Sequence, residues 1–549
     1  MSEETNYETQ RIDHFGIVTG ISREIELVET IDQKVGQTGR KVSCGEGTLA
    51  MIQNALGFSS RALYLMPDYM RNKPVDLLIG PGLEPEDFND DSLGRCLDDI
   101  YAAGVTEVFA SVASRALKEY GIEHQFVHLD SSSFHLHGEY DVDAPGEEMV
   151  SITHGYSRDH RPDLKQVVAQ IITSHKSNLP VWLEVLSGNS SDKESFPESV
   201  KAYCEHLAGG KKPYFVMDSA GYSENNLKEI ENILWLMRVP ETLAEAKRLV
   251  KETAQDQMVE LEPGYFGKEF PMEYGGVAQR WLVVFSQAAY ERELKTLQKA
   301  QTREQEAVEK QWRKVSQPIF NCREDAEAAS KQFNQRWKYH RASEQVTPIT
   351  QYAHSGRPVT GSQPEIVGYT LTGTVQLYVA GVEEAKRSLG KFIIATNELD
   401  AQNLPAAAML ENYTAQGVSV ERGFRFLKDP MFFAHSLFLK SPARIMAMIM
   451  IMGLALLIFA LGERKLRHAL KQSNESVPDQ KGKPTQTPTL RWVFQVFEGL
   501  DVLSVRSNGQ LITRKILNLR PIHEQIIRLL GPQVQKSYLF ASQSAVGFS

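Results

Sequence analysis

The sequence predicts an α/β core that is interrupted by a β-rich insertion with a helical hairpin and preceded by a helical N-terminal domain. Three observations lead to this prediction. Short helical patterns closed by glycines fill residues 1–122, strands alternate with helices over 123–242, and charged helices followed by alternating strands occupy 243–410. A chain of 549 residues also exceeds the size at which one hydrophobic core stops growing, so several domains are expected.

Composition and charge set the broad class. The chain is 42% apolar and 23% charged, as is usual for globular proteins. Its net charge of -9 argues mildly against a nucleic-acid partner, because proteins that bind phosphates usually carry a basic excess. The charge is unevenly spread, however: between Arg422 and Glu475 nine Lys/Arg stand against three acids, a local excess of +6.

The cysteines and the first residues indicate a cellular setting. Cysteines stand at four scattered positions with no CxxC pair: Cys44, Cys96, Cys204 and Cys322. This distribution argues against disulfides and against a zinc site. The N-terminus lacks the basic and apolar regions of a signal peptide. We therefore expect a reducing, cytoplasmic location.

Residues 1–122 are predicted to be helical with short loops. The segment from Gly45 to Gly57 has the pattern of a helix closed by a glycine. A second helix is expected to begin at Ser92 and to stop near Gly104, and a third to cover Thr106–Tyr120. These helices are interpreted as one domain.

The pattern changes to strands with intervening helices over residues 123–242, the first part of the predicted core. The expected strands are Phe126–Asp130, Met149–His154, Val181–Leu186, Tyr214–Asp218 and Leu234–Val239. The expected helices are Phe196–Leu207 and Ser223–Ile230. Three early strands, a helix, and then alternating strand and helix is the order of an RNase H-like α/β fold.

An insertion is predicted over residues 243–410. Two charged antiparallel helices are expected within 290–342, because their apolar positions are sparse: Leu294, Leu297, Val308, Trp312, Phe333 and Trp337. Period-two alternation then predicts strands at Gly368–Val379 and Lys391–Thr396.

The remaining chain is predicted to contain a second part of the core, a linker and a small C-terminal tail. Residues 411–471 are expected to be helical and to form the second part of the core. Residues 472–490 are polar and proline-containing, as in a linker. A small C-terminal tail, 491–549, contains Asn508-Gly509, which is typical of a hairpin turn.

The uncharged segment Ile445–Gly462 allows two interpretations. Its length is near that of a membrane span. It is, however, the single segment of this kind, it is rich in Met, and it lacks flanking Trp or Tyr anchors. A helix that is apolar on all sides is also typical of the centre of a large soluble protein, and we favour this second interpretation.

Three carboxylates stand out as candidate ligands of a metal ion. Asp130 and Asp218 each end a predicted strand, and these two strands are neighbours in the expected sheet. Glu421 lies on a predicted helix among basic residues. Carboxylate oxygens suit Mg²⁺, and two such ions about 3.5–4 Å apart can stabilise both oxygens of a phosphoryl displacement. We expect Asp130 to bridge two Mg²⁺ ions and Asp218 and Glu421 to hold one each, with Mn²⁺ able to substitute.

Other acids compete for this role. Asp159 and Asp163 lie in a predicted loop, Glu184 lies within a strand, and Asp192 precedes a helix. Their positions favour supporting roles, with Asp159 the strongest competitor. A strand-ending aspartate can equally be a helix cap, so a single such residue would indicate little.

Four segments together resemble the DDE transposases of bacterial insertion sequences, in the group with a β-rich insertion and a Tyr–Arg–Glu–Lys motif. The segments begin at His128-Leu-Asp130, Arg158-Asp-His-Arg, Asp218-Ser-Ala-Gly and Tyr413, and the resemblance covers roughly residues 10–470. Six residues separate Glu421 from Lys428, as in the family motif. Gln416 occupies the motif's Arg position, and four residues rather than three precede Glu421.

The resemblance implies an activity and its partners. A transposase of this group binds the terminal inverted repeats of its element, cuts the ends with Mg²⁺ and joins them to target DNA, as a dimer that holds two ends. The implied partner is double-stranded DNA, with no membrane, in the bacterial nucleoid. Residues 1–122 would then be either a DNA-end-binding module or a plain scaffold.

The same resemblance assigns DNA contacts to Tyr413, Arg422, Arg425 and Lys428. Arg425 and Lys428 follow Glu421 at i+4 and i+7, so the three share one helix face. The alternative for this face is a solvated row of ion pairs. Two other functions remain open: an RNase H-like nuclease without strand transfer, and an inactive DNA-binding protein derived from a transposase.

Overall fold

The computed structural model describes residues 5–58, 61–122, 125–136, 150–157, 161–207, 210, 212–352, 363–415, 439–508 and 510–539. The chain divides into two compact units. The first combines Met1–Leu236 with Glu411–Ser549, and the second is Met237–Leu410.

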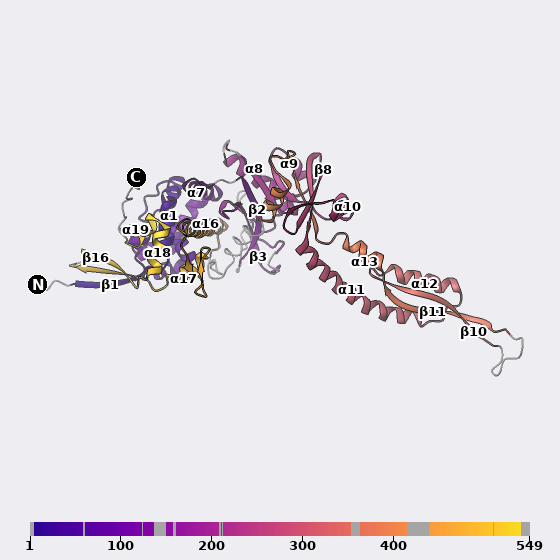
Figure 1. The fold of residues 1–549 in the computed structure, drawn as a ribbon. Helices are drawn as coiled ribbons and strands as arrows, with labels where there is room; N and C mark the ends of the chain where they lie inside the picture. Colours follow the sequence, from indigo (N-terminus) through magenta and orange to yellow (C-terminus); the bar gives the residue numbers. More distant parts are fainter. Residues whose placement is uncertain are drawn as a thin grey trace. The chain divides into compact units, whose positions relative to one another are not determined.

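Helices dominate the N-terminal part of the first unit (Figure 1). They are α1 (Phe15–Glu24), α2 (Leu27–Val35), α3 (Cys44–Leu56), α4 (Met66–Met70), α5 (Val75–Leu78), α6 (Asp90–Ala102) and α7 (Val105–Glu119). Ser43 caps α3 in a capping box with Glu46, and Asn89 caps α6. The three helices predicted by sequence, α3, α6 and α7, are confirmed.

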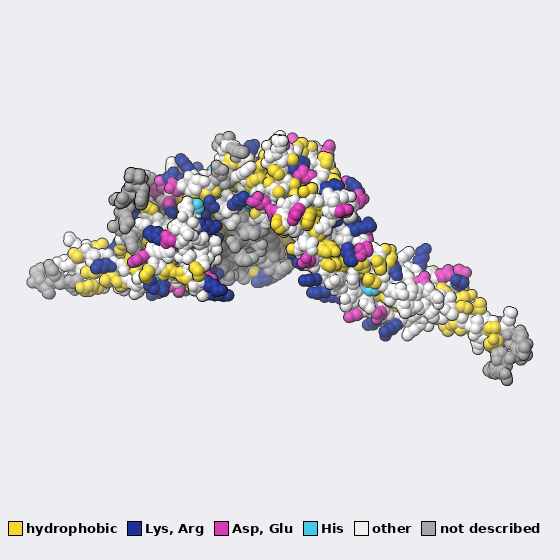
Figure 2. All heavy atoms as spheres, in the orientation of Figure 1, with side chains coloured by type: hydrophobic (Ala, Val, Ile, Leu, Met, Phe, Trp, Pro, Cys, Tyr) yellow, Lys and Arg dark blue, Asp and Glu magenta, His cyan; other side chains and the backbone are white. Residues whose placement is uncertain are grey.

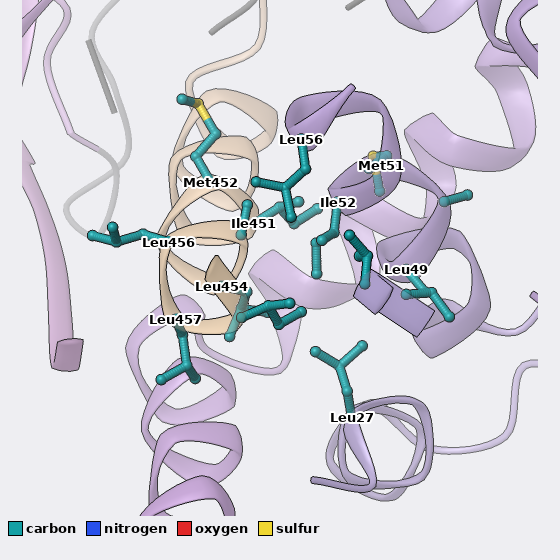
Figure 3. Packing of buried hydrophobic residues seen from close by; sticks show 14 of the residues in the cluster. Leu27, Leu49, Met51, Ile52, Leu56, Ile451, Met452, Leu454, Leu456 and Leu457 are labelled. Carbon is teal, nitrogen blue, oxygen red and sulfur yellow. The ribbon is translucent and has the colours of Figure 1, made fainter. Parts of the chain in front are cut away.

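The long apolar helix α16 (Pro442–Gln472) packs into these helices. It contacts α1, α3, α6 and α7, and also strand β4 (Pro180–Ser187). Figure 3 shows Ile451 and Leu454 of α16 pointing toward Ile52 and Leu56 of α3. All four side chains are at most 1% exposed, so this contact is part of the hydrophobic core of the unit.

Helix α16 is also the one candidate for a membrane span among the described residues. It is long and apolar enough to cross a bilayer, but 78% of its most apolar window is buried against the rest of the protein. Core helices of soluble proteins pass the same test of length and composition.

The two ends of the chain meet in the first unit. Strand β1 (Thr5–Arg11) pairs antiparallel with β15 (Asp501–Ser507), which pairs with β16 (Gln510–Leu517). β15 and β16 pair on either side of the predicted turn, with Ser507 opposite Gln510 and Asn508 at a φ of +49°, while Gly509 lies outside the described residues. Three helices accompany these strands: α17 (Leu490–Val496), α18 (Pro521–Leu530) and α19 (Pro532–Ser537).

The segment predicted as a linker carries a short antiparallel pair, β13 (Val477–Pro478) with β14 (Pro484–Thr485). Val477 is buried, and Glu475 forms an ion pair with Arg528 of α18. These contacts fasten the segment to the C-terminal helices.

The first unit also contains a mixed sheet with the strand order β4-β3-β2-β5, followed by β6 (Trp235–Arg238) at the boundary between the units. β2 (Phe126–Leu136) is antiparallel to β3 (Lys165–Ser174) and parallel to β5 (Tyr214–Met217). Two helices follow the predicted pattern, α8 (Asp192–His206) and α9 (Glu224–Glu229).

One strand prediction is wrong. Of the segment Met149–His154, the described residues form only an isolated bridge between Thr153 and Gln166. The second strand of the sheet is instead β3, which was not predicted. Gln166 and Gln170 interrupt the apolar run of β3, so the sequence does not show this segment as a buried strand. In the structure both side chains are nevertheless buried, because each forms a hydrogen bond.

The second unit has its own strands, in the order β12-β9-β8-β7. They are β7 (Val259–Glu262), β8 (Tyr265–Tyr274), β9 (Val277–Ser286) and β12 (Lys391–Thr396). The predicted strand β12 is confirmed, whereas β8 and β9 were not predicted. Helices α10 (Ala244–Glu252) and α13 (Val379–Lys386) belong to this unit, and α14 (Ala406–Thr414) lies at its boundary with the first unit.

Two consecutive helices, α11 (Gln287–Ser316) and α12 (Arg323–Gln335), occupy the range in which the helical hairpin was predicted. Both helices run beside a two-stranded ribbon of β10 (His340–Gln351) and β11 (Glu365–Leu377) (Figure 1). A small core fills the space between them, made of Val308, Trp312, Ala326, Phe333, Ala342 and Leu371.

Candidate active site

Asp130 and Asp218 occupy matching positions on two adjacent parallel strands. The parallel register of β2 and β5 pairs Phe126 with Tyr214 and ends with His128 opposite Val216. Each aspartate follows its strand's last paired residue by two positions. Because adjacent parallel strands advance at the same rate, this register gives the two aspartates matching positions along neighbouring strands.

The two aspartates have different surroundings. Asp218 is exposed, and its Oδ1 accepts a hydrogen bond of 2.8 Å from the amide of Ala220, which caps the 3₁₀ turn Ser219–Gly221. Asp130 is half-buried, and its Oδ1 accepts a hydrogen bond of 2.8 Å from the amide of Ser131. Both carboxylates are therefore held by backbone donors and reach solvent.

The prediction that Asp130 ends its strand is wrong. β2 continues past it to Leu136, and Ser131, Ser132 and Ser133 are all buried within the strand. Polar residues normally indicate the end of a buried strand. Here, Ser131 is buried because its hydroxyl donates to the carboxylate of Asp192, the first residue of α8.

A polar row joins this part of the sheet to α8. Ser131, Gln170 and Glu184 lie directly opposite one another on β2, β3 and β4. They hydrogen-bond to Asp192, Ser195 and Ser199, which are spaced along one face of α8. The row fixes α8 across three strands and so fixes the backbone beside Asp130.

This row gives supporting roles to two of the competing acids. Asp192 accepts from Ser131, and Glu184 accepts from Ser199 and, over 2.8 Å, from the indole of Trp182. Burial raises the pKa of Glu184, and its two donors partly oppose this shift.

A third competitor, Asp163, is exposed and is paired with Arg161, with atoms 2.9 and 2.7 Å apart. The hydrogen bonds from Arg161 hold the pKa of Asp163 down at about 2. Asp159 lies outside the described residues. Asp163 therefore has the geometry of a surface ion pair.

Helix α14 brings the next part of the predicted site to the sheet. Glu411 of α14 forms an ion pair of 2.9 Å with Lys176, in the turn that follows β3. Tyr413, predicted to contact DNA, lies half-buried on the same helix. Glu421, Arg422, Arg425 and Lys428 follow this helix in the chain, and all four lie outside the described residues.

The described residues fit a divalent ion in part. Asp130 and Asp218 supply hard oxygen ligands at adjacent positions, which is the donor set that Mg²⁺ prefers. Among the described ranges, no group of three or more His, Cys, Asp and Glu side chains is arranged to hold a metal ion. The predicted third ligand, Glu421, is not among those residues.

Comparison with known proteins gives three results. No curated protein matches the chain. Among solved structures, the chain is similar to a piggyBac transposase synaptic complex with hairpin DNA, at 9% identity and a TM-score of 0.35, over 90% of this chain and 82% of that one. Residues 7–114 match a domain of unknown function, DUF4277.

A second family model matches the larger part of the chain. Residues 122–458 match the family model described as "Transposase DDE domain". This range is more than half of the 549 residues, and it includes β2, β5 and α14. The protein therefore belongs to the DDE transposase family and is a DDE transposase.

Proposed function

We propose that the protein is the transposase of an insertion sequence, which cuts the phosphodiester at each end of its element and joins the freed 3′ hydroxyl to target DNA. The observation that supports this proposal is the matched position of Asp130 and Asp218 on β2 and β5. We also propose that the mixed sheet around them is the RNase H-like core, and that the chain acts as a dimer on two ends in the nucleoid.

The carboxylates have specific roles in this proposal. Asp130, Asp218 and Glu421 would together hold two Mg²⁺ ions. When bound, the ions stabilise the attacking and leaving oxygens of an in-line displacement. Water attacks first and the 3′ hydroxyl second, without a covalent protein intermediate. Tyr413, Arg422, Arg425 and Lys428 hold the phosphates that flank the cut.

The decisive experiment replaces each strand aspartate by its neutral isostere. Asp130→Asn and Asp218→Asn each remove a metal ligand and preserve size, so end cleavage should fall by about a thousandfold or more. Binding to the uncut end should change little, because these ligands serve the chemistry. Asp163→Asn is the matched control, since it neutralises an exposed aspartate that pairs with Arg161. Cleavage by Asp130→Asn within tenfold of the wild type would remove Asp130 from the site.

Two alternatives give different products. An RNase H-like nuclease would cut DNA but would yield no joined strands with a target plasmid. An inactive, transposase-derived protein would bind DNA and cut nothing in Mg²⁺ or Mn²⁺. Inverted repeats on both sides of the gene would support the insertion-sequence assignment directly.

A further inference from the structure

The longest helix of the second unit carries seven cations on one side. They are Arg292, Lys295, Lys299, Arg303, Lys310, Arg313 and Lys314 of α11, all of them exposed. Successive residues of a helix turn by about 100°, so these positions fall within an arc of about 100°. We call this set the cationic stripe. Figure 2 shows Lys and Arg side chains gathered along the edge of α11.

Packing on the other side of α11 fixes the direction of the stripe. Leu297, Val308 and Trp312 are buried on the face opposite the cations. The indole of Trp312 donates to the carbonyl of Gly373 over 3.1 Å. The helix therefore cannot rotate about its axis without breaking the small core of the helical hairpin, and the stripe faces solvent.

The acids of α11 do not neutralise the stripe. Glu304 accepts the amides of Lys338 and Tyr339, and Glu293 accepts the amide of Gly390. Both glutamates thus bind backbone on the flank of the helix. Among the ranges that the structure describes, no ion pair joins a cation of the stripe to a carboxylate. Glu306 is the one acid of α11 that lies within the arc.

We propose that the cationic stripe binds the phosphate backbone of duplex DNA, as a contact surface of the insertion separate from the carboxylate site. This inference rests on the proposed function, which makes DNA the substrate. The spacing is suitable: Arg292 and Lys314 lie about 33 Å apart along the helix, close to the length of one turn of B-DNA. The absence of aromatic side chains from the arc favours phosphate contacts over stacking on unpaired bases.

The stripe contributes affinity without reading sequence. Each neutralised phosphate releases counterions, so binding that uses the stripe weakens steeply as salt increases. Such a surface would hold DNA next to the element's end, whatever its sequence.

The test uses the full-length protein and a linear duplex of mixed sequence, with Ca²⁺ in place of Mg²⁺ so that binding proceeds without turnover. The double variant Lys299→Gln/Arg303→Gln removes two cations of the stripe. Fluorescence anisotropy over about 50 to 200 mM salt should show the logarithmic salt slope reduced by about one unit for each lost contact. Glutamine has nearly the helix propensity of lysine and arginine, so the helix should persist, and circular dichroism verifies this.

Two matched controls make the result specific. Lys331→Gln/Arg336→Gln removes two exposed cations from the α12 segment and changes the net charge equally. Lys299→Arg/Arg303→Lys keeps the charge of the stripe. Both should retain the wild-type slope. Equal slopes for the stripe variant and the α12 control would overturn the proposal, because the effect would then be one of net charge.

The same variants distinguish duplex DNA from other anionic partners. If the stripe variant loses binding to vesicles of anionic phospholipid or to single-stranded RNA but keeps its slope on duplex DNA, the proposal is overturned. Failure of the proposed function has a different signature: the wild type would bind the duplex with a steep slope and would cut no element ends in Mg²⁺. If the wild type cuts element ends but the stripe variant keeps the wild-type salt slope, the proposal for the cationic stripe is refuted and the proposed function stands.

Discussion

His128, which lies two residues before Asp130 on β2, has its Nε2 atom 3.0 Å from Nδ1 of His175. His128 is fully buried, and burial, with a smaller contribution from His175, lowers its pKa to about 3. Burial also lowers the pKa of His175. The pair is therefore neutral in the folded protein at physiological pH, and it places no positive charge beside the candidate metal ligand.

This relationship predicts a pH dependence of stability. In the unfolded chain an imidazole has a pKa of about 6.5, so between about pH 3 and 6.5 the unfolded state binds a proton that folded His128 does not. The free energy of unfolding should fall as the pH falls through this window. His128→Asn should reduce the dependence by up to about 1.4 kcal/mol per pH unit, measured by urea unfolding. His468→Asn, at an exposed position of α16, should leave it unchanged.

Exchange of the metal ion tests the carboxylate site. If Asp130 and Asp218 hold a catalytic ion through oxygen atoms, Mn²⁺ should support end cleavage in place of Mg²⁺. Ca²⁺ should permit DNA binding without turnover, because its flexible coordination of six to eight ligands suits the two-ion geometry poorly. Gel analysis of labelled ends measures both. Equal cleavage in EDTA and in Mg²⁺ would contradict the site.

The interior position of α16 predicts the effect of a buried charge. Leu454 is 0% exposed, so Leu454→Lys places an unpaired ammonium in the core and should leave the protein unfolded or insoluble. His468→Lys adds the same side chain at an exposed position of the same helix and should remain soluble. Fractionation with a carbonate wash provides a second readout. Recovery of the native wild type only from the membrane pellet would contradict the core assignment of α16.

A close approach between two helices predicts a third stability effect. A Cβ added to Gly20 of α1 would lie 2.6 Å from the Cα of Val534 in α19, and this backbone atom cannot move aside without shifting the helix. Gly20→Ala should therefore destabilise the first unit by about 1–3 kcal/mol. Lys536→Ala, on an exposed position of α19, should cost little. Thermal melting compares the two variants. Equal melting temperatures would show that α19 can shift to accommodate the added Cβ without loss of stability.

The sequence predicted helices well where residues close to the helix ends determine where the helix begins and ends. The helices predicted from Gly45 and from Ser92 lie close to the true starts of α3 and α6, which Ser43 and Asn89 cap in the structure. β8 and β9 were missed although a signal exists. Gly275-Gly276 joins them, and both glycines have positive φ, as a two-residue hairpin loop requires.

Long-range pairing could not be predicted from local patterns. The polar stretch Ser131–Ser133 belongs to a strand only because α8 supplies a partner for Ser131, and Asp192 lies some sixty residues later. Asp130 and Asp218 were correctly expected on neighbouring strands from the strand order of the expected fold, but the end of β2 was misplaced. The register of β2 with β5 depends on the assembled sheet.

The pairing of β1 with β15 has a consequence for the synthesis of the protein. At about 5–20 residues per second, the ribosome needs roughly 25–100 s after making β1 to complete β15. During this interval α1, α3 and α6 lack α16 and α19, against which they pack in the finished protein. A nascent chain thus carries its first helices with uncovered apolar faces until α16 and α19 have been made. Release before α16 would yield a polypeptide without the centre of its core.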